Sequence, residues 1–230
     1  MNPVLLLAAV LPAVVLLIRV YRLDKIEKEP RGLLWRLAGF GALMGVAASV
    51  LETGLLRVLH LWIKPDSLWF LILENFIVVA LIEELCKRWP VMRLAWRHPA
   101  FDYRFDAVVY CVFSALGFAA LENVLYVMQY GLSVAVSRAL LSVPGHFFFA
   151  VYMGIYLGEA KQAEKNDELY ERDALLRASI AVPTLLHGFW DFSLSVESRW
   201  MTLAFYLFVV VFFLIANHRL GVASETDNRL

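Results

Sequence analysis

The amino-acid sequence predicts an all-α protein of the membrane, a polytopic helix bundle with about seven transmembrane helices. Of its 230 residues, 61% are hydrophobic and only 18% are charged, which is too little charge to cover a soluble domain of this length. Apolar runs recur at the length of about 20 residues that a helix needs to cross a bilayer. These runs mix Ala, Leu and Phe without the period-two alternation that membrane strands require.

Seven apolar runs are long enough to cross the membrane, so we treat 1–230 as a single membrane domain. The runs lie near 3–20, 33–51, 67–88, 105–129, 138–158, 175–195 and 199–217. Small residues recur at about helical spacing within 39–49, which predicts a face for close helix packing. The polar stretch 159–174 is expected to be a cytosolic loop, and 218–230 a short cytosolic tail.

The distribution of basic residues predicts the orientation of the bundle. Most of the 21 Lys and Arg residues fall in alternate connections, and only Arg57, Lys64, Arg138 and Arg199 lie on the other side. By the positive-inside rule, the N-terminus is expected outside and the C-terminus in the cytosol. The first run has no basic residue before it, which favours an uncleaved helix over a signal peptide.

The hydrophobic composition and the apolar runs also predict the location of the protein and its surroundings. A multi-pass protein of the cell membrane, in bacteria the inner membrane, has the lipid bilayer as its first partner. The formal net charge is +0, so there is no basic excess that would indicate binding to nucleic acid.

Ionisable residues inside the predicted spans form a candidate site, because a charged group at bilayer depth is costly unless it faces the bundle interior and finds a partner. The segments that hold them are LIEELCK with Glu83 and Glu84, GFAALEN with Glu122 and Asn123, SVPGHFFF with His146, and LLHGFWDF with His187 and Asp191. A single such residue often makes only a hydrogen bond between helices. Four helices that each contribute one indicate a shared site.

The residue types in this set fit hydrolytic chemistry. Two histidines and a glutamate are the donors of a zinc site with an open fourth position, so we expect Glu122, His146 and His187 to bind Zn²⁺. A further glutamate, Glu83, would take a proton from the bound water. Asp191 lies one helical turn from His187 and is expected to orient its imidazole. The sequence has no HExxH, so the ligands must come from separate helices.

The third run is expected to continue as a helix to about Arg97. If the helix stopped at Arg88, Glu83 would lie too near the inner membrane surface to meet the other polar groups. Glu83 precedes Lys87 by four residues, the favourable order for an ion pair on one helix face. We expect Lys87 to face a wet cavity open to the cytosol. Glu52 lies near an outer helix end and is expected to be interfacial.

Three of these segments resemble the motifs of a known family. The segments EELCK at 83–87, FAALEN at 118–123 and HGFWD at 187–191 are similar to EExxK, FxxxEN and HxxxD of the PrsW family of intramembrane proteases. His146 occupies the place of the family's further histidine. The related CAAX prenyl endopeptidases differ at two points, because Glu122 stands where they have His and Lys87 comes one position early.

The resemblance implies an intramembrane endopeptidase that cleaves a membrane-spanning protein, for example an anti-sigma factor. It implies that Glu83 and Glu84 are the catalytic glutamate pair and that Glu122, His146 and His187 complete the active site. The supporting residues would be Lys87, Asn123 and Asp191. A metal-free water activated by glutamate fits the same residues as a zinc-bound one. From the residues alone, a proton- or ion-coupled transporter and a non-catalytic membrane scaffold are the competing functions.

Overall fold

The computed structural model describes residues 3–65 and 67–230, and its regular elements are all helical within those ranges. The elements, in which η denotes a π-helical segment, are α1 (Pro3–Leu23), α2 (Arg31–Trp62), α3 (Leu68–Ile72), η1 (Leu73–Leu81), α4 (Ile82–Pro90), η2 (Val91–Ala95), α5 (Asp106–Tyr130), α6 (Leu132–Ser137), η3 (Arg138–Ser142), α7 (Val143–Lys165), α8 (Leu169–Ser195) and α9 (Arg199–Glu225).

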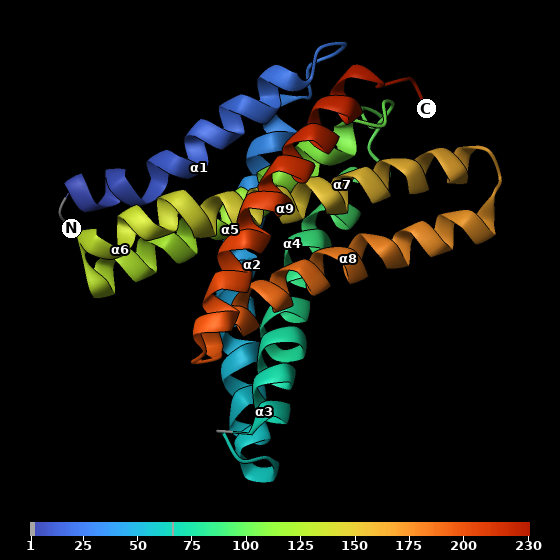
Figure 1. Cartoon of the computed structure of the whole chain (residues 1–230). Helices are drawn as coiled ribbons and strands as arrows, with labels where there is room; N and C mark the ends of the chain where they lie inside the picture. Colours follow the sequence, from blue (N-terminus) through green and yellow to red (C-terminus); the bar gives the residue numbers. More distant parts are fainter. Residues whose placement is uncertain (1–2, 66) are drawn as a thin grey trace.

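These elements join into seven helical rods within the described residues (Figure 1). The third rod runs without interruption from α3 to η2, and the fifth from α6 to α7. Five rods are long and apolar enough to cross a membrane: α1, α2, α5, the rod Leu132–Lys165 and α9. The predicted helical membrane bundle is therefore confirmed. The third rod and α8 are the other two expected spans, and both hold charged residues of the candidate site.

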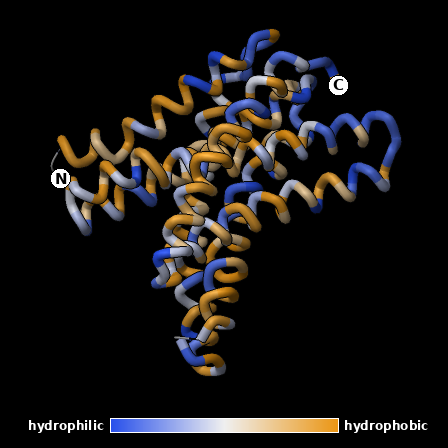
Figure 2. Tube along the Cα trace, viewed as in Figure 1, coloured by the Kyte–Doolittle hydropathy of each residue, from blue (hydrophilic) through white to orange (hydrophobic). Residues whose placement is uncertain are grey.

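The rods spread from a shared centre (Figure 1). Helices α1 and α6 lie on one side, and the hairpin of α7 and α8 extends to the other. The inner core comes mainly from α5 and α7, because nearly every residue of α5 from Asp106 to Ala119 is buried. Helix α5 stops at Gly131, whose φ of 81° lies in the left-handed region that glycine adopts readily. Figure 2 shows hydrophilic residues gathered at the α7–α8 connection and the C-terminal end.

The third rod continues past Arg88, as the sequence predicted. Helix α4 includes Pro90 at its end, and the π-helical segment η2 extends the rod to Ala95. Proline lacks the N–H that a helix interior uses, and a π-helical turn is one way in which a helix accommodates such a break. This continuity lifts Glu83 away from the end of the rod.

Glycines bring α2 and α5 into direct backbone contact. A Cβ atom added at Gly41 would collide with the carbonyl oxygen of Ser114, and one added at Gly117 would collide with that of Ala38. Gly45 faces the ring of Phe118 at an ordinary contact distance. The close-packing face predicted within 39–49 is therefore confirmed. It fixes the position of α5, which carries Glu122.

We expect Gly41→Ala to lower the free energy of unfolding by about 1–3 kcal/mol, because the methyl group must displace the backbone of α5. Thermal unfolding of the purified protein in detergent measures this. Gly39→Ala is the matched control on the same helix, since a Cβ at Gly39 meets nothing within 4 Å and alanine favours the helix. Equal unfolding temperatures for the two variants would contradict the packing account.

Candidate active site

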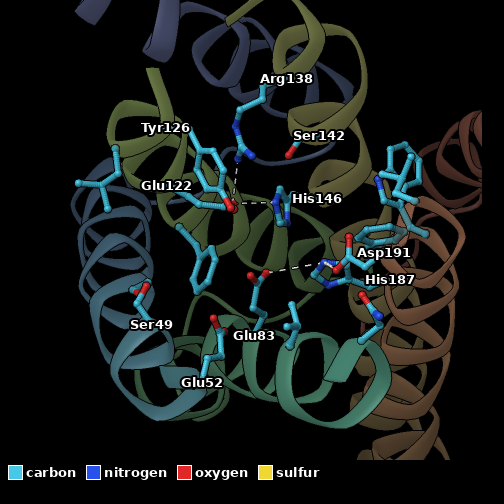
Figure 3. A pocket seen from close by; sticks show the side chains of 18 of the residues that line it. Ser49, Glu52, Glu83, Glu122, Tyr126, Arg138, Ser142, His146, His187 and Asp191 are labelled. Carbon is cyan, nitrogen blue, oxygen red and sulfur yellow. Dashed lines mark hydrogen bonds and ion pairs between the residues drawn. The ribbon is translucent and has the colours of Figure 1, made fainter. Parts of the chain in front are cut away.

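The polar residues expected to share a site do lie together in the structure (Figure 3). They come from four separate rods. Helix α4 supplies Glu83, Glu84 and Lys87, helix α5 supplies Glu122, helix α7 supplies His146, and helix α8 supplies His187 and Asp191. Residues from distant parts of the sequence therefore meet in the interior of the bundle.

Lys87 lies at the centre of this cluster. Its Nζ donates to Glu83 Oε2 at 2.9 Å and to Glu84 Oε1 at 2.7 Å, and it contacts His146 Nδ1 at 2.9 Å. The residue is only 1% exposed. The expectation that Lys87 faces a wet cavity open to the cytosol was therefore wrong, because its three N–H groups are all directed at buried partners.

His187 is held through both ring nitrogens. Its Nδ1 lies 3.0 Å from Glu84 Oε1, and its Nε2 lies 3.2 Å from Asp191 Oδ2 and 3.9 Å from Glu83 Oε2. Asp191 thus contacts the histidine one turn away, as the spacing predicted. The partner on the other nitrogen is Glu84, which comes from a different helix and is fully buried. Sequence spacing alone gave no sign of that contact.

Glu122 and His146 form the other side of the site. His146 Nε2 lies 3.1 Å from Glu122 Oε2, and the ring centroids of His146 and His187 are 5.5 Å apart. Arg138 Nη2 lies 3.1 Å from the same Glu122 oxygen, while its Nε donates to Asn123 Oδ1 at 2.8 Å. Asn123 in turn donates to the carbonyl oxygen of Ala9 at 2.6 Å, which ties α5 to α1.

Arg138 is a site residue that sequence reasoning missed. It stands at the first position of the fifth apolar run, where it was counted only as a charge that marks the orientation. Its one available signal was its position eight residues before His146, about two helical turns away. The packing of η3 against α5 is what turns it toward Glu122.

A cavity of about 440 Å³ adjoins the cluster, and its wall includes Glu52, Glu83, Glu122, Arg138, His146, His187 and Asp191. Further lining comes from residues near the C-terminal ends of helices, including Tyr126 of α5 and Ser195 of α8. The cavity therefore lies toward the C-terminal ends of α5 and α8. Glu52 lies on its wall with a buried, unpartnered Oε1, so this residue belongs to the lining of the site.

One group in the described chain has the composition and spacing of a metal site. Glu83, His146 and His187 each offer one ligand atom, and these atoms lie within 4.8 Å of one another. Zinc binds such ligands at about 2.0–2.2 Å, so small side-chain shifts would let all three reach one ion. This set differs from the expected one in its carboxylate, because Glu83 and not Glu122 approaches both histidines. The donor chemistry fits a divalent metal.

The site places two histidines and several carboxylates beside an internal cavity of a helical membrane protein. These are the side chains that a membrane-embedded hydrolase uses. Comparison with known proteins identifies the family of hydrolases to which the chain belongs. The PrsW family of intramembrane metalloproteases matches residues 29–216. The chain therefore belongs to the PrsW family and is an intramembrane peptidase. The transporter and scaffold alternatives are set aside by this finding.

Several relatives match over most of the chain. Protease PrsW of Geobacillus kaustophilus is 36% identical over 85% of this chain and 82% of its own length. Protease PrsW of Oceanobacillus iheyensis is 34% identical over 96% of each chain. Protease PrsW of Bacillus subtilis is 33% identical over 84% of each chain. No solved structure matches the chain significantly.

Lys87→Met should destabilise the protein by about 3–5 kcal/mol, because two buried carboxylates would lose their shared cation. The unfolding temperature in detergent reports the change. Adding Glu84→Gln to Lys87→Met should recover part of the loss, since it removes one of the charges left unpaired. A Lys87→Met variant as stable as the wild type would show that the ammonium does not compensate Glu83 and Glu84.

Proposed function

We propose that this peptidase hydrolyses a peptide bond of a membrane-anchored protein, such as an anti-sigma factor, in the bacterial cell membrane. The observation that carries the proposal is the meeting of Glu83, His146 and His187 within 4.8 Å on the wall of an internal cavity. The bundle is oriented with its N-terminus outside and its C-terminus in the cytosol, which the asymmetry of Lys and Arg supports.

The proposed metal is Zn²⁺, held by His146, His187 and Glu83. When bound, it would polarise the peptide carbonyl and lower the pKa of a water molecule. Glu84 holds His187 by its Nδ1, while Nε2 lies 3.2 Å from Asp191 Oδ2 and 3.9 Å from Glu83 Oε2. A histidine ligand is commonly fixed by a carboxylate on its other nitrogen, so the role of Glu84 is to set the tautomer and orientation of His187.

Glu122 is the proposed acceptor of the water proton. Its carboxylate contacts His146 Nε2 and lies beside the Arg138 guanidinium. It is on the cavity wall, where a water molecule next to the histidines would be within reach. Glu83, whose carboxylate has an oxygen within 4.8 Å of a ring nitrogen of each histidine, completes the ligand set. The same carboxylate can return the proton to the leaving amine when the C–N bond breaks.

The position of the cavity supports a substrate segment that enters from the outer side. Its wall includes Tyr126, near the end of α5, and Ser195, at the end of α8, and the charge distribution assigns both of these helix ends to that side. On the other side of the histidines, the buried Lys87 cluster excludes water. A peptide bond in or near the outer half of a membrane-spanning segment is therefore the proposed target.

Glu83→Gln should abolish cleavage while leaving the fold intact, because glutamine keeps the shape but is a poor metal ligand. The test reconstitutes the purified protein in vesicles with a single-span anti-sigma factor and follows the products on gels. A chelator should remove wild-type activity, and added Zn²⁺ should restore it. Undiminished cleavage by Glu83→Gln, with or without the chelator, would exclude this carboxylate from the chemistry.

Glu84→Gln should lower activity by roughly 10- to 100-fold, the usual range for a residue that orients a metal ligand. It should also weaken binding of Co²⁺, a spectroscopic substitute for zinc, measured by absorbance titration. Asp191→Ala should have the smaller effect of the two, because Asp191 contacts the nitrogen that faces the cavity. If Asp191→Ala proved more damaging to metal binding, Asp191 would be a ligand in its own right.

A further inference from the structure

The catalytic cavity carries an excess of negative charge. Four carboxylates lie on its wall: Glu52, Glu83, Glu122 and Asp191. Among the described residues that line it, Arg138 is the one side chain with a permanent positive charge. When water adds to a peptide carbonyl, negative charge develops on the carbonyl oxygen. A hydrogen-bond donor directed at that oxygen would offset the negative charge of the cavity wall, in addition to the polarisation that a bound metal would supply.

The other cationic or imidazole donors near the cavity are already engaged. The ring nitrogens of His146 contact Lys87 and Glu122, and those of His187 contact Glu84 and Asp191. Lys87 is buried behind the histidines and directed at its own partners. Arg138 is therefore the cationic group that has donors left for a substrate.

The guanidinium of Arg138 is fixed at its Nε edge, whereas its Nη2 edge makes no hydrogen bond. It stacks over the Tyr126 ring, with 4.2 Å from Cζ to the centroid, and its Nε is bound to Asn123. Its Nη2 is buried and makes no hydrogen bond, although it lies 3.1 Å from Glu122 Oε2. Nη2 is thus held by an ion pair that does not use its hydrogen-bonding capacity. Figure 3 shows Arg138 directed toward Glu122, on the side of the site that faces His146.

We propose that Arg138 donates a hydrogen bond to the carbonyl oxygen of the scissile peptide bond and stabilises the negative charge that forms there. This role rests on the proposed hydrolysis of a membrane-anchored substrate. Water forms a bond to the carbonyl carbon, one of its protons passes to Glu122, and the carbonyl π pair moves to the oxygen beside Arg138. When that pair re-forms the double bond, the C–N bond breaks and the nitrogen takes the proton from Glu122.

The geometry suits this role, because Arg138 and His146 contact the same Glu122 oxygen at 3.1 Å each. A carbonyl group placed between the guanidinium and His146 would therefore lie next to the carboxylate that takes the proton. The reacting carbon, the proton acceptor and the charge-stabilising donor are brought together by two adjacent contacts. The π-helical segment η3 begins at Arg138, and such segments often occur at functional sites.

Steady-state cleavage of a single-span anti-sigma factor by the full-length enzyme in vesicles tests the proposal. Arg138→Gln should lower kcat by about 10²- to 10³-fold, the usual cost of removing one oxyanion donor, with KM within about threefold of wild type. Arg138→Ala should regain part of its kcat when methylguanidinium is added, and the gain should saturate. Arg57→Gln is the matched control, an exposed arginine on α2 away from the cavity, and its kcat should not change.

Three outcomes would overturn this role. A kcat for Arg138→Gln within about threefold of wild type would exclude Arg138 from the chemistry. A large loss that methylguanidinium does not restore, accompanied by a lower unfolding temperature and a raised KM, would assign Arg138 to holding Glu122 and Asn123 in place. If the wild-type enzyme with bound zinc cleaves no membrane-anchored substrate, the proposed function fails, and the role of Arg138 fails with it.

Discussion

The burial of the Lys87 ammonium is the interaction on which the site depends. A charge inside a membrane bundle is tolerated only when it is paired and hydrogen-bonded, and Lys87 meets this condition with two glutamates of its own helix and a histidine of α7. The two glutamates are three and four residues away, so they face the lysine only if α4 stays helical across them. Glu84 also binds His187 of α8. One buried cation thus joins three rods.

The backbone geometry of the rods gives this cluster its position. Close contact of α2 and α5 through Gly41 and Gly117 sets the depth of α5 and with it the place of Glu122. The three π-helical segments within the described residues occur in the two rods that supply Glu83 and His146. A π-helical turn adds a residue and changes which side chains face inward after it. These segments therefore change which side chains of a rod face the site, so that the same rod can present ionisable residues to the site and apolar residues elsewhere.

Much of the fold and the membership of the site could be predicted from sequence, because both rest on local rules. Apolar runs of membrane length give the rods, and helical spacing gives the contacts from Lys87 to Glu83 and from Asp191 to His187. The contact from Glu84 to His187 could not be predicted, since it depends on how α4 and α8 pack. For the same reason Glu52, a lone acid in α2, gave no sign that it lies on the cavity wall.

The direction in which the cavity opens could not be predicted either, because it depends on where the bundle is tightly packed and where it is loose. The depth of the ionisable residues showed that a wet space was needed, but not which end of the helices would admit water. Tight packing of α5 against α2 and α7 fills the predicted inner half with buried side chains. The Lys87 cluster closes the floor of the cavity, since none of its donors is left for water.

This asymmetry explains how a hydrolase can hold water inside a membrane protein without opening a path across it. The side chains that line the cavity lie on one side of the histidines, and the ion pairs of Lys87 lie on the other. The network that positions His187 and His146 therefore also fills the space behind the cavity, because Lys87 and Glu84 are buried there and paired with one another.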